Sequence, residues 1–174
     1  MAMETVYSFA TLERKIKLPL THIDSNIKSV LEKKINKTLE GKCTVEGFIK
    51  KDSCVVTTYS SGLLTGNSIE FVVIFKCELC TPVEGMTITC SVDNITKAGI
   101  KASIPGEYSP ITVFIVRDHH HRIKEFSTIK IGEMIKIRVL GQRYELNDEF
   151  ISVIGELLLN KDKGKQPRIL FKDN

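Results

Sequence analysis

Two short clusters in this 174-residue chain carry side chains that could bind a metal ion or react as thiols. Cys77 and Cys80 form a C-x-x-C pair, and Asp118 directly precedes a run of three histidines, His119–His121. Residues three apart in a strand point to opposite faces, and no second C-x-x-C supplies two further ligands. We therefore expect no native metal at either cluster, and we interpret the histidines as polar surface residues.

The other residue patterns that could support catalysis are incomplete. The Gly62–Gly66 loop lacks the lysine and the strand-to-helix context of a phosphate-binding loop. A magnesium-dependent active site needs clustered carboxylates to hold the metal, whereas Asp93, Asp118 and Asp148 are isolated in sequence. We expect no enzymatic activity and no cofactor. A small zinc or thiol enzyme would depend only on the two clusters already described.

Charge and cysteine content restrict the class of protein. Lys and Arg number 25 against 21 Asp and Glu, and this net charge of +4 permits contact with nucleic acid without indicating a strongly basic binder. No apolar run approaches 18 residues and no charged-then-apolar leader is present, so we expect a protein that neither spans a membrane nor is secreted. The five cysteines are then expected to be reduced and mostly buried.

The first 84 residues predict a small β-α-β-β-β domain. Residues 7–18 form the expected opening strand, with Pro19 as its end. A helix should follow, capped by Asp24 or Ser25 and ended by Gly41, because apolar residues recur at helical spacing, namely Ile27, Val30, Leu31, Ile35 and Leu39. Its opposite face is expected to be solvated rather than to contact phosphate, and carries Lys28, Lys33, Lys34 and Lys37.

The strands of this domain follow the helix. Residues 43–50 and 53–59 read as two strands, and the loop 62–67 leads into a long strand, 69–79. That long strand is apolar on both faces along its first half, which is typical of a strand inside a sheet. The domain is expected to need a partner to cover its remaining apolar surface, and Pro82 ends it.

From Gly85 the pattern changes to short strands separated by turns. Five are expected, at 86–92, 100–104, 111–116, 134–139 and 150–154, and a five-stranded Greek-key barrel is an OB fold. Residues 132–139 and 151–157 resemble the second half of the ribosomal-protein-S1 type of OB domain. The predicted class is therefore α+β and rich in strand, with a tip domain over 1–84 and an OB domain over 85–159. A polar tail, 160–174, is expected to be mobile unless its apolar patch, Ile169–Phe171, docks on a partner.

The OB domain carries candidate contacts for single-stranded RNA. Such domains bind a strand with cationic groups along the backbone and rings beneath the bases. The candidates are Lys97, Lys101, Tyr108, Arg117, His119, His121, Arg122, Lys136, Arg138 and Arg143, with Phe126 and Tyr144 as further stacking rings. Each residue alone could equally be a solvated charge or a partly packed ring. The group predicts weak, sequence-independent binding that falls steeply with salt.

Residues 61–85 carry a family resemblance. They combine a loop similar to Gly-x-Ile-x-x-Gly, the strand after it and a Pro-x-x-Gly hinge into the OB domain, and residues 39–44 match the family's turn after the helix. The chain resembles, from about residue 7 to 158, the stalk subunit of multisubunit RNA polymerases. This family includes the seventh subunit of eukaryotic polymerase II and its archaeal counterpart.

The resemblance implies a non-catalytic subunit that works through interfaces. In the family, the tip plugs into the large subunits of the polymerase core at the base of the clamp, the OB domain follows nascent RNA, and a helical second stalk subunit binds across both domains. The resemblance assigns the core contact to the loop and the helix end, namely Gly62, Leu63, Leu64, Thr65, Gly66 and Leu39. The histidine run and the absence of a long insertion in the OB domain depart from the family pattern.

The source and the runner-up function stay open at this point. The divergence fits a large DNA virus, which would place the protein in host cytoplasm, a viral factory or the virion. A cellular source would place it in the nucleus or the cytoplasm. The alternative function is a free-standing protein of translation or RNA decay that binds single-stranded RNA. The apolar loop at 62–67 separates the two hypotheses, since an independent RNA binder has no use for it.

Overall fold

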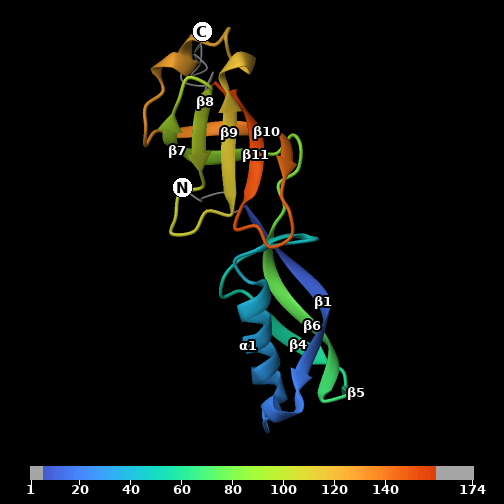
Figure 1. Ribbon diagram of the computed structural model, residues 1–174. Helices are drawn as coiled ribbons and strands as arrows, with labels where there is room; N and C mark the ends of the chain where they lie inside the picture. Colours follow the sequence, from blue (N-terminus) through green and yellow to red (C-terminus); the bar gives the residue numbers. More distant parts are fainter. Residues whose placement is uncertain (1–5, 160–174) are drawn as a thin grey trace, which may run out of the picture.

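A helix-backed sheet and a closed barrel lie end to end in the computed structural model (Figure 1). The structure describes residues 6–159, so the predicted tail at 160–174 and its apolar patch lie outside the described residues. The architecture confirms the predicted fold class, strand-rich α+β with a small tip domain and a five-stranded barrel. No helix within residues 6–159 combines the length and apolar character needed to cross a membrane.

The tip is organised around one long strand. β6 (Ser68–Cys80) pairs antiparallel with β1 (Tyr7–Pro19) over the whole length of both strands. The other edge of β6 is occupied in succession by three short strands, β5 (Leu63–Thr65), β4 (Val55–Tyr59) and β3 (Gly47–Ile49), and β2 (Cys43–Thr44) pairs with β3. The long apolar strand is therefore interior to the sheet, as its sequence predicted.

One helix covers the buried face of this sheet. β6 buries alternate side chains (Phe71, Val73, Phe75, Cys77 and Leu79), as the period of two requires. These residues share a core with Leu31 and Ile35 of α1 (Ile27–Leu39). Between β1 and α1 lies a single 3-10 turn, η1 (Leu20–His22).

Two local predictions in the tip are wrong. The helix is capped by Asn26, whose side chain accepts the Ser29 N–H at 3.2 Å, rather than by Asp24 or Ser25. The expected strand over 43–50 is broken into the β2–β3 hairpin, because the chain reverses before Gly47, which has a φ of +139°. The Thr44 hydroxyl donates to the Gly47 carbonyl at 3.0 Å and holds this reversal closed.

The second half forms the predicted barrel. Its strands are β7 (Thr87–Ile95), β8 (Gly99–Ser103), β9 (Ile111–Val116), β10 (Met134–Arg143) and β11 (Ile151–Leu158). The order β10-β11-β9-β8-β7 closes through pairing of β10 with β7. β11 runs parallel to β9 while the other pairs are antiparallel, which gives the Greek-key connection of an OB fold. The 3-10 turns η2 (Arg117–His119) and η3 (Lys124–Thr128) connect β9 to β10.

The two halves share buried residues at their junction. The barrel core contains Cys43, Phe48 and Cys80, all contributed by strands of the tip sheet. Cys77, three residues before Cys80, lies instead in the tip core. The C-x-x-C pair is thus divided between two cores, which confirms the prediction that its side chains point to opposite faces.

Candidate functional sites

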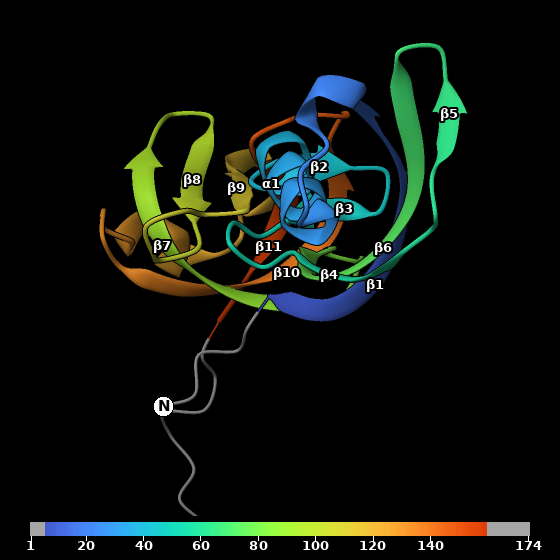
Figure 2. The ribbon, with the colours of Figure 1, turned by 90° about the horizontal axis from the view of Figure 1, so that it is seen from below.

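An exposed hairpin forms the free end of the tip. β5 pairs with the start of β6 through a two-residue turn at Gly66 and Asn67, and the hairpin stands apart from α1 and the barrel in the view from below (Figure 2). Leu63 is 68% exposed and Leu64 is 66% exposed. Leu20, 46% exposed, joins this end of the molecule because its N–H donates to the Asn67 carbonyl at 3.1 Å. The predicted loop is therefore an ordered strand that presents apolar side chains to solvent.

Gly62 fixes how the hairpin leaves the sheet. It has a φ of +86°, and a Cβ at this position would lie 2.6 Å from an Ile69 methyl and 2.9 Å from the Phe71 ring. A glycine is required there for both reasons. Because the chain passes so close to Phe71, the following two leucines start from a fixed point on the core of the tip.

Leu39 does not lie with the hairpin. It is half-buried against the tip core, at the C-terminal end of α1. The next residue, Glu40, accepts the N–H groups of Asp52, Ser53 and Cys54 at 2.8–3.1 Å, and Lys50 donates its N–H to the Glu78 carbonyl near the far end of β6. About 27 Å of strand separates Glu78 from Glu70, which pairs with Leu63. The predicted contact residues of the tip therefore fall at two separate places.

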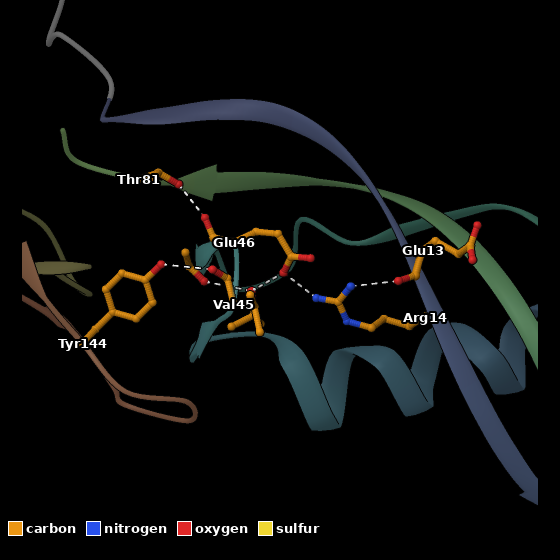
Figure 3. Close-up of polar contacts among 8 residues, drawn as sticks. Glu13, Arg14, Val45, Glu46, Thr81 and Tyr144 are labelled. Carbon is orange, nitrogen blue, oxygen red and sulfur yellow. Dashed lines mark hydrogen bonds and ion pairs between the residues drawn. The ribbon is translucent and has the colours of Figure 1, made fainter.

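The junction between the halves is held by polar contacts around the β2–β3 hairpin (Figure 3). The Tyr144 hydroxyl, from the loop after β10, donates to the Val45 carbonyl at 3.2 Å, and the Thr81 hydroxyl donates to the Glu46 carbonyl at 2.8 Å. The same loop after β10 exchanges two backbone hydrogen bonds with Cys43, through Asn147 and Asp148. The hydroxyl of Tyr144, which was predicted as a stacking ring for RNA, therefore has a hydrogen-bond partner within the protein.

Glu46 ties this hairpin to β1. Its carboxylate accepts a hydrogen bond from the Arg14 guanidinium, which is the main cause of a lowered Glu46 pKa, and lies 3.0 Å from the Thr44 hydroxyl, whose single proton it shares with the Gly47 carbonyl (Figure 3). A further contact joins the two halves, because the Lys51 ammonium lies 3.7 Å from the centre of the Tyr108 ring. Tyr108, predicted as an RNA contact, is thus 59% exposed but already covered on one face by a cation.

The predicted cations of the barrel lie at four separate places. One group gathers at the end far from the tip, where the Arg117 guanidinium donates to the Lys97 and Thr96 carbonyls at 3.0 and 3.1 Å. Lys97 and Arg117 line a shallow open depression together with Ile95 and Thr96. The exposed side chains of His119, His121 and Arg122 follow at the same end. This end of the barrel therefore carries five of the ten predicted contacts.

The other cations are separated around the barrel wall. Lys101 on β8 is two strands away from Lys136 and Arg138 on β10, so in a closed five-stranded barrel they point in widely different directions. Arg138 pairs with Glu156 at 2.8 Å, and Arg143 lies 3.7 Å from Glu145 at the junction end. The ten predicted RNA contacts therefore do not form one continuous surface.

Phe114 is an aromatic candidate that was missed from the sequence. It is 40% exposed at the middle of β9, where it pairs with Lys101 of β8 and with Ile154 of β11. Strand alternation could have identified it, because Val113 and Ile115 on either side are buried. A ring beside a cation on the outer wall of an OB fold is suited to stacking under a base.

His120 and Phe126 are buried, contrary to expectation. His120 is 2% exposed: its Nε2 accepts the Leu157 N–H at 2.9 Å, and its Nδ1 lies 2.7 Å from the Val116 carbonyl. Its ring stacks on Phe126, which is 4% exposed, at a centroid distance of 5.3 Å. The middle histidine of the run is therefore a core residue of the barrel, and Phe126 is not free to stack on a base. No group of three or more metal-ligating side chains occurs within residues 6–159.

Comparison with known proteins adds one relationship over almost the whole chain. The sequence is 25% identical over 170 residues to "Putative DNA-directed RNA polymerase subunit L376" of Acanthamoeba polyphaga mimivirus. The chain is similar to a viral RNA polymerase subunit. The match covers 91% of this chain and 85% of the viral protein, so it includes both the tip and the barrel. No protein-family model matches the chain.

Proposed function

We propose that this protein is a non-catalytic subunit of a DNA-directed RNA polymerase, attached to the large subunits through its β5–β6 hairpin. The similarity to the mimivirus protein supports a role in such a polymerase. The main support for this attachment is that Leu63 and Leu64 are about two-thirds exposed on an ordered hairpin at the free end of the tip. Apolar side chains that a rigid element presents to solvent are suited to burial in a partner's pocket.

The proposed mechanism is mechanical rather than chemical. A hairpin wedged beside the mobile clamp of the polymerase stabilises whichever clamp position it contacts better, and a modest difference in affinity shifts the two populations. The barrel then projects from the core and contacts nascent RNA through the far-end group around Lys97 and Arg117. Its place in the cell is wherever that polymerase works: host cytoplasm, viral factory or virion for a viral enzyme. A helical second subunit bound across both halves is a prediction from the family resemblance.

The attachment predicts that charges in the hairpin abolish assembly. Leu63→Asp with Leu64→Asp should reduce recovery of the large polymerase subunits with the tagged chain by at least about tenfold, because a buried carboxylate without a partner costs well over 1.4 kcal/mol. Both side chains face solvent in the isolated chain, so its stability should be unchanged. The measurement is quantitative mass spectrometry of the proteins co-purified from the native source.

The matched control is Ile131→Asp, at an equally exposed residue (66%) in the turn before β10. This variant should recover the polymerase subunits like the unchanged chain. If ribosomal or RNA-decay proteins are recovered instead, and the hairpin variant recovers them equally, the chain is a free-standing RNA-binding protein.

RNA contact at the far end predicts a weak and strongly salt-dependent affinity. For about three phosphates neutralised, raising monovalent salt from 50 to 200 mM should weaken binding of a single-stranded RNA roughly 10- to 20-fold. Lys97→Glu should weaken binding further and flatten this dependence. Lys28→Glu, the same substitution on the exposed face of α1, should do neither. Fluorescence anisotropy with labelled oligonucleotides of unrelated sequence measures both effects, and a salt-independent affinity would contradict the assignment.

A further inference from the structure

Two buried thiols face each other across neighbouring strands of the tip. β4 and β6 are antiparallel, with Val55 opposite Lys76 and Val56 opposite Phe75. Continuing this register by one residue places Cys54 opposite Cys77. Both side chains belong to the tip core, with Cys54 8% exposed and Cys77 1% exposed.

The hydrogen-bond directions define the kind of site that this pair occupies. The Cys54 N–H donates to a Glu40 carboxylate oxygen at 2.8 Å, so it points away from β6. The N–H of Val56, on the same side of β4, donates to Glu32 of α1 at 3.1 Å. Cys54 and Cys77 therefore form a non-hydrogen-bonded pair, in which opposite Cα atoms lie about 4.5 Å apart and side chains approach most closely. That spacing lies within the range that a disulfide bond spans.

The pKa values of the two thiols are also shifted in opposite directions. A hydrogen bond from the Cys54 thiol lowers the pKa of Cys77, and the Arg14 guanidinium adds to this lowering against the effect of burial. The same hydrogen bond raises the pKa of Cys54. Of the two thiols, Cys77 is therefore the one that loses its proton more readily. Burial instead raises the pKa of Cys43 to about 11 and those of Cys80 and Cys90 to about 12, which makes these three thiols poor nucleophiles.

We propose that Cys54 and Cys77 are a site of reversible oxidation, at which hydrogen peroxide converts the two thiols into an intramolecular disulfide bond. The Cys77 thiolate attacks one peroxide oxygen, the O–O bond breaks, and the leaving hydroxide takes a proton to become water. Cys54 then attacks the sulfur of the resulting sulfenic acid, and its proton leaves with the hydroxyl as a second water. Two thiols and one peroxide thus give one disulfide and two waters.

The position of β4 gives a small oxidant access to the pair. Cys54 directly precedes β4 and follows the exposed turn at Lys51 and Asp52. β4 has only five residues, and its outer edge is held by Glu32 and Glu40 rather than by another strand. Local opening of such a short edge strand needs far less free energy than global unfolding.

The remaining cysteines provide an internal comparison. Cys43 and Cys80 lie in the same sheet, but Phe48 of β3 stands between them, since it pairs with both. Two strand spacings amount to about 9.5 Å, which is beyond the reach of a disulfide bond. Cys90 lies on β7 of the barrel. Among the cysteines of residues 6–159, strand register therefore places only Cys54 and Cys77 directly opposite each other.

The experiment treats the folded, fully reduced chain with hydrogen peroxide, alkylates the remaining thiols in denaturant and identifies linked peptides by mass spectrometry. We expect an intact mass lower by about 2 Da. Alkylation at Cys54 and Cys77 should fall at least about tenfold, and dithiothreitol should restore it. Cys43, Cys80 and Cys90 should remain alkylated. A Cys43→Ser variant should behave like the unchanged chain, whereas Cys54→Ser and Cys77→Ser should each form no internal bond.

Three results would overturn the proposal. One is a linkage between any other pair in the folded chain. Another is oxidation of Cys77 to a sulfinic acid without formation of the bond. The third is a Cys54–Cys77 linkage no more frequent in the folded chain than in urea, where register plays no part. Because these readouts use the isolated chain, they are independent of its attachment to a polymerase.

Discussion

Replacing His120 by alanine is expected to lower the free energy of unfolding by about 3 kcal/mol. The substitution leaves the Leu157 N–H and the Val116 carbonyl without their side-chain partner at a site that is 2% exposed. It also removes the ring that stacks on Phe126 and opens a cavity between η3 and β11. Urea denaturation followed by circular dichroism measures the effect, since the chain has no tryptophan.

Three further variants separate the hydrogen bonds from the packing. His120→Leu restores much of the volume but not the hydrogen bonds, and should still cost about 2 kcal/mol. His119→Ala and His121→Ala remove exposed neighbours and should change stability by less than about 0.5 kcal/mol. If His120→Leu proves as stable as the unchanged chain, the hydrogen bonds of this histidine do not stabilise the barrel.

Gly47→Ala should destabilise the protein by about 3–4 kcal/mol, because the backbone of the tip approaches itself there without room for a methyl group. An added Cβ would lie 2.5 Å from the Cys80 carbonyl oxygen and 2.5 Å from the Thr81 hydroxyl. Relief requires β3 to move away from β6, which also displaces Phe48 from the barrel core. Urea denaturation measures the loss, and a single transition detected by both near- and far-ultraviolet circular dichroism would show that the halves still unfold together.

Gly106→Ala is the matched control for this substitution. Gly106 has a φ of +146°, close to the +139° of Gly47, but a Cβ added there would meet no atom within 4 Å. Its cost should therefore be only that of an unfavourable backbone conformation, about 1–2 kcal/mol. Equal costs for the two variants would show that the sheet yields easily at Gly47.

Apolar patterns that extend over whole strands and over the helix predicted most of the fold. Apolar residues on both faces of the first half of β6 predicted its place inside the sheet, and the structure buries one of those two faces. The five barrel strands were located as short apolar runs separated by turns, and β9 was found at its observed bounds. The helix cap was missed because Asp24, Ser25 and Asn26 are all suitable caps, and only the chain direction beyond η1 selects Asn26.

The candidate sites were harder to predict because they depend on which strands meet. His120 sits between two exposed histidines, and nothing in that run indicates that β11 brings a backbone N–H to its ring. Lys101 and Lys136 look alike in sequence, yet closure of the barrel directs them apart. The facing of Cys54 and Cys77 likewise depends on the register between β4 and β6, 23 positions apart in the chain.

The shared core at the junction has a mechanical consequence. Cys43, Phe48 and Cys80 are buried with the barrel, and β6 runs without interruption from there to the hairpin, a length of about 40 Å. The tip and the barrel are therefore expected to move together as one rigid body rather than as two flexibly linked domains. A force applied to η2 at one end is transmitted to Leu63 and Leu64 at the other. If the hairpin is anchored in a partner, a load on the distant barrel therefore acts on that anchor.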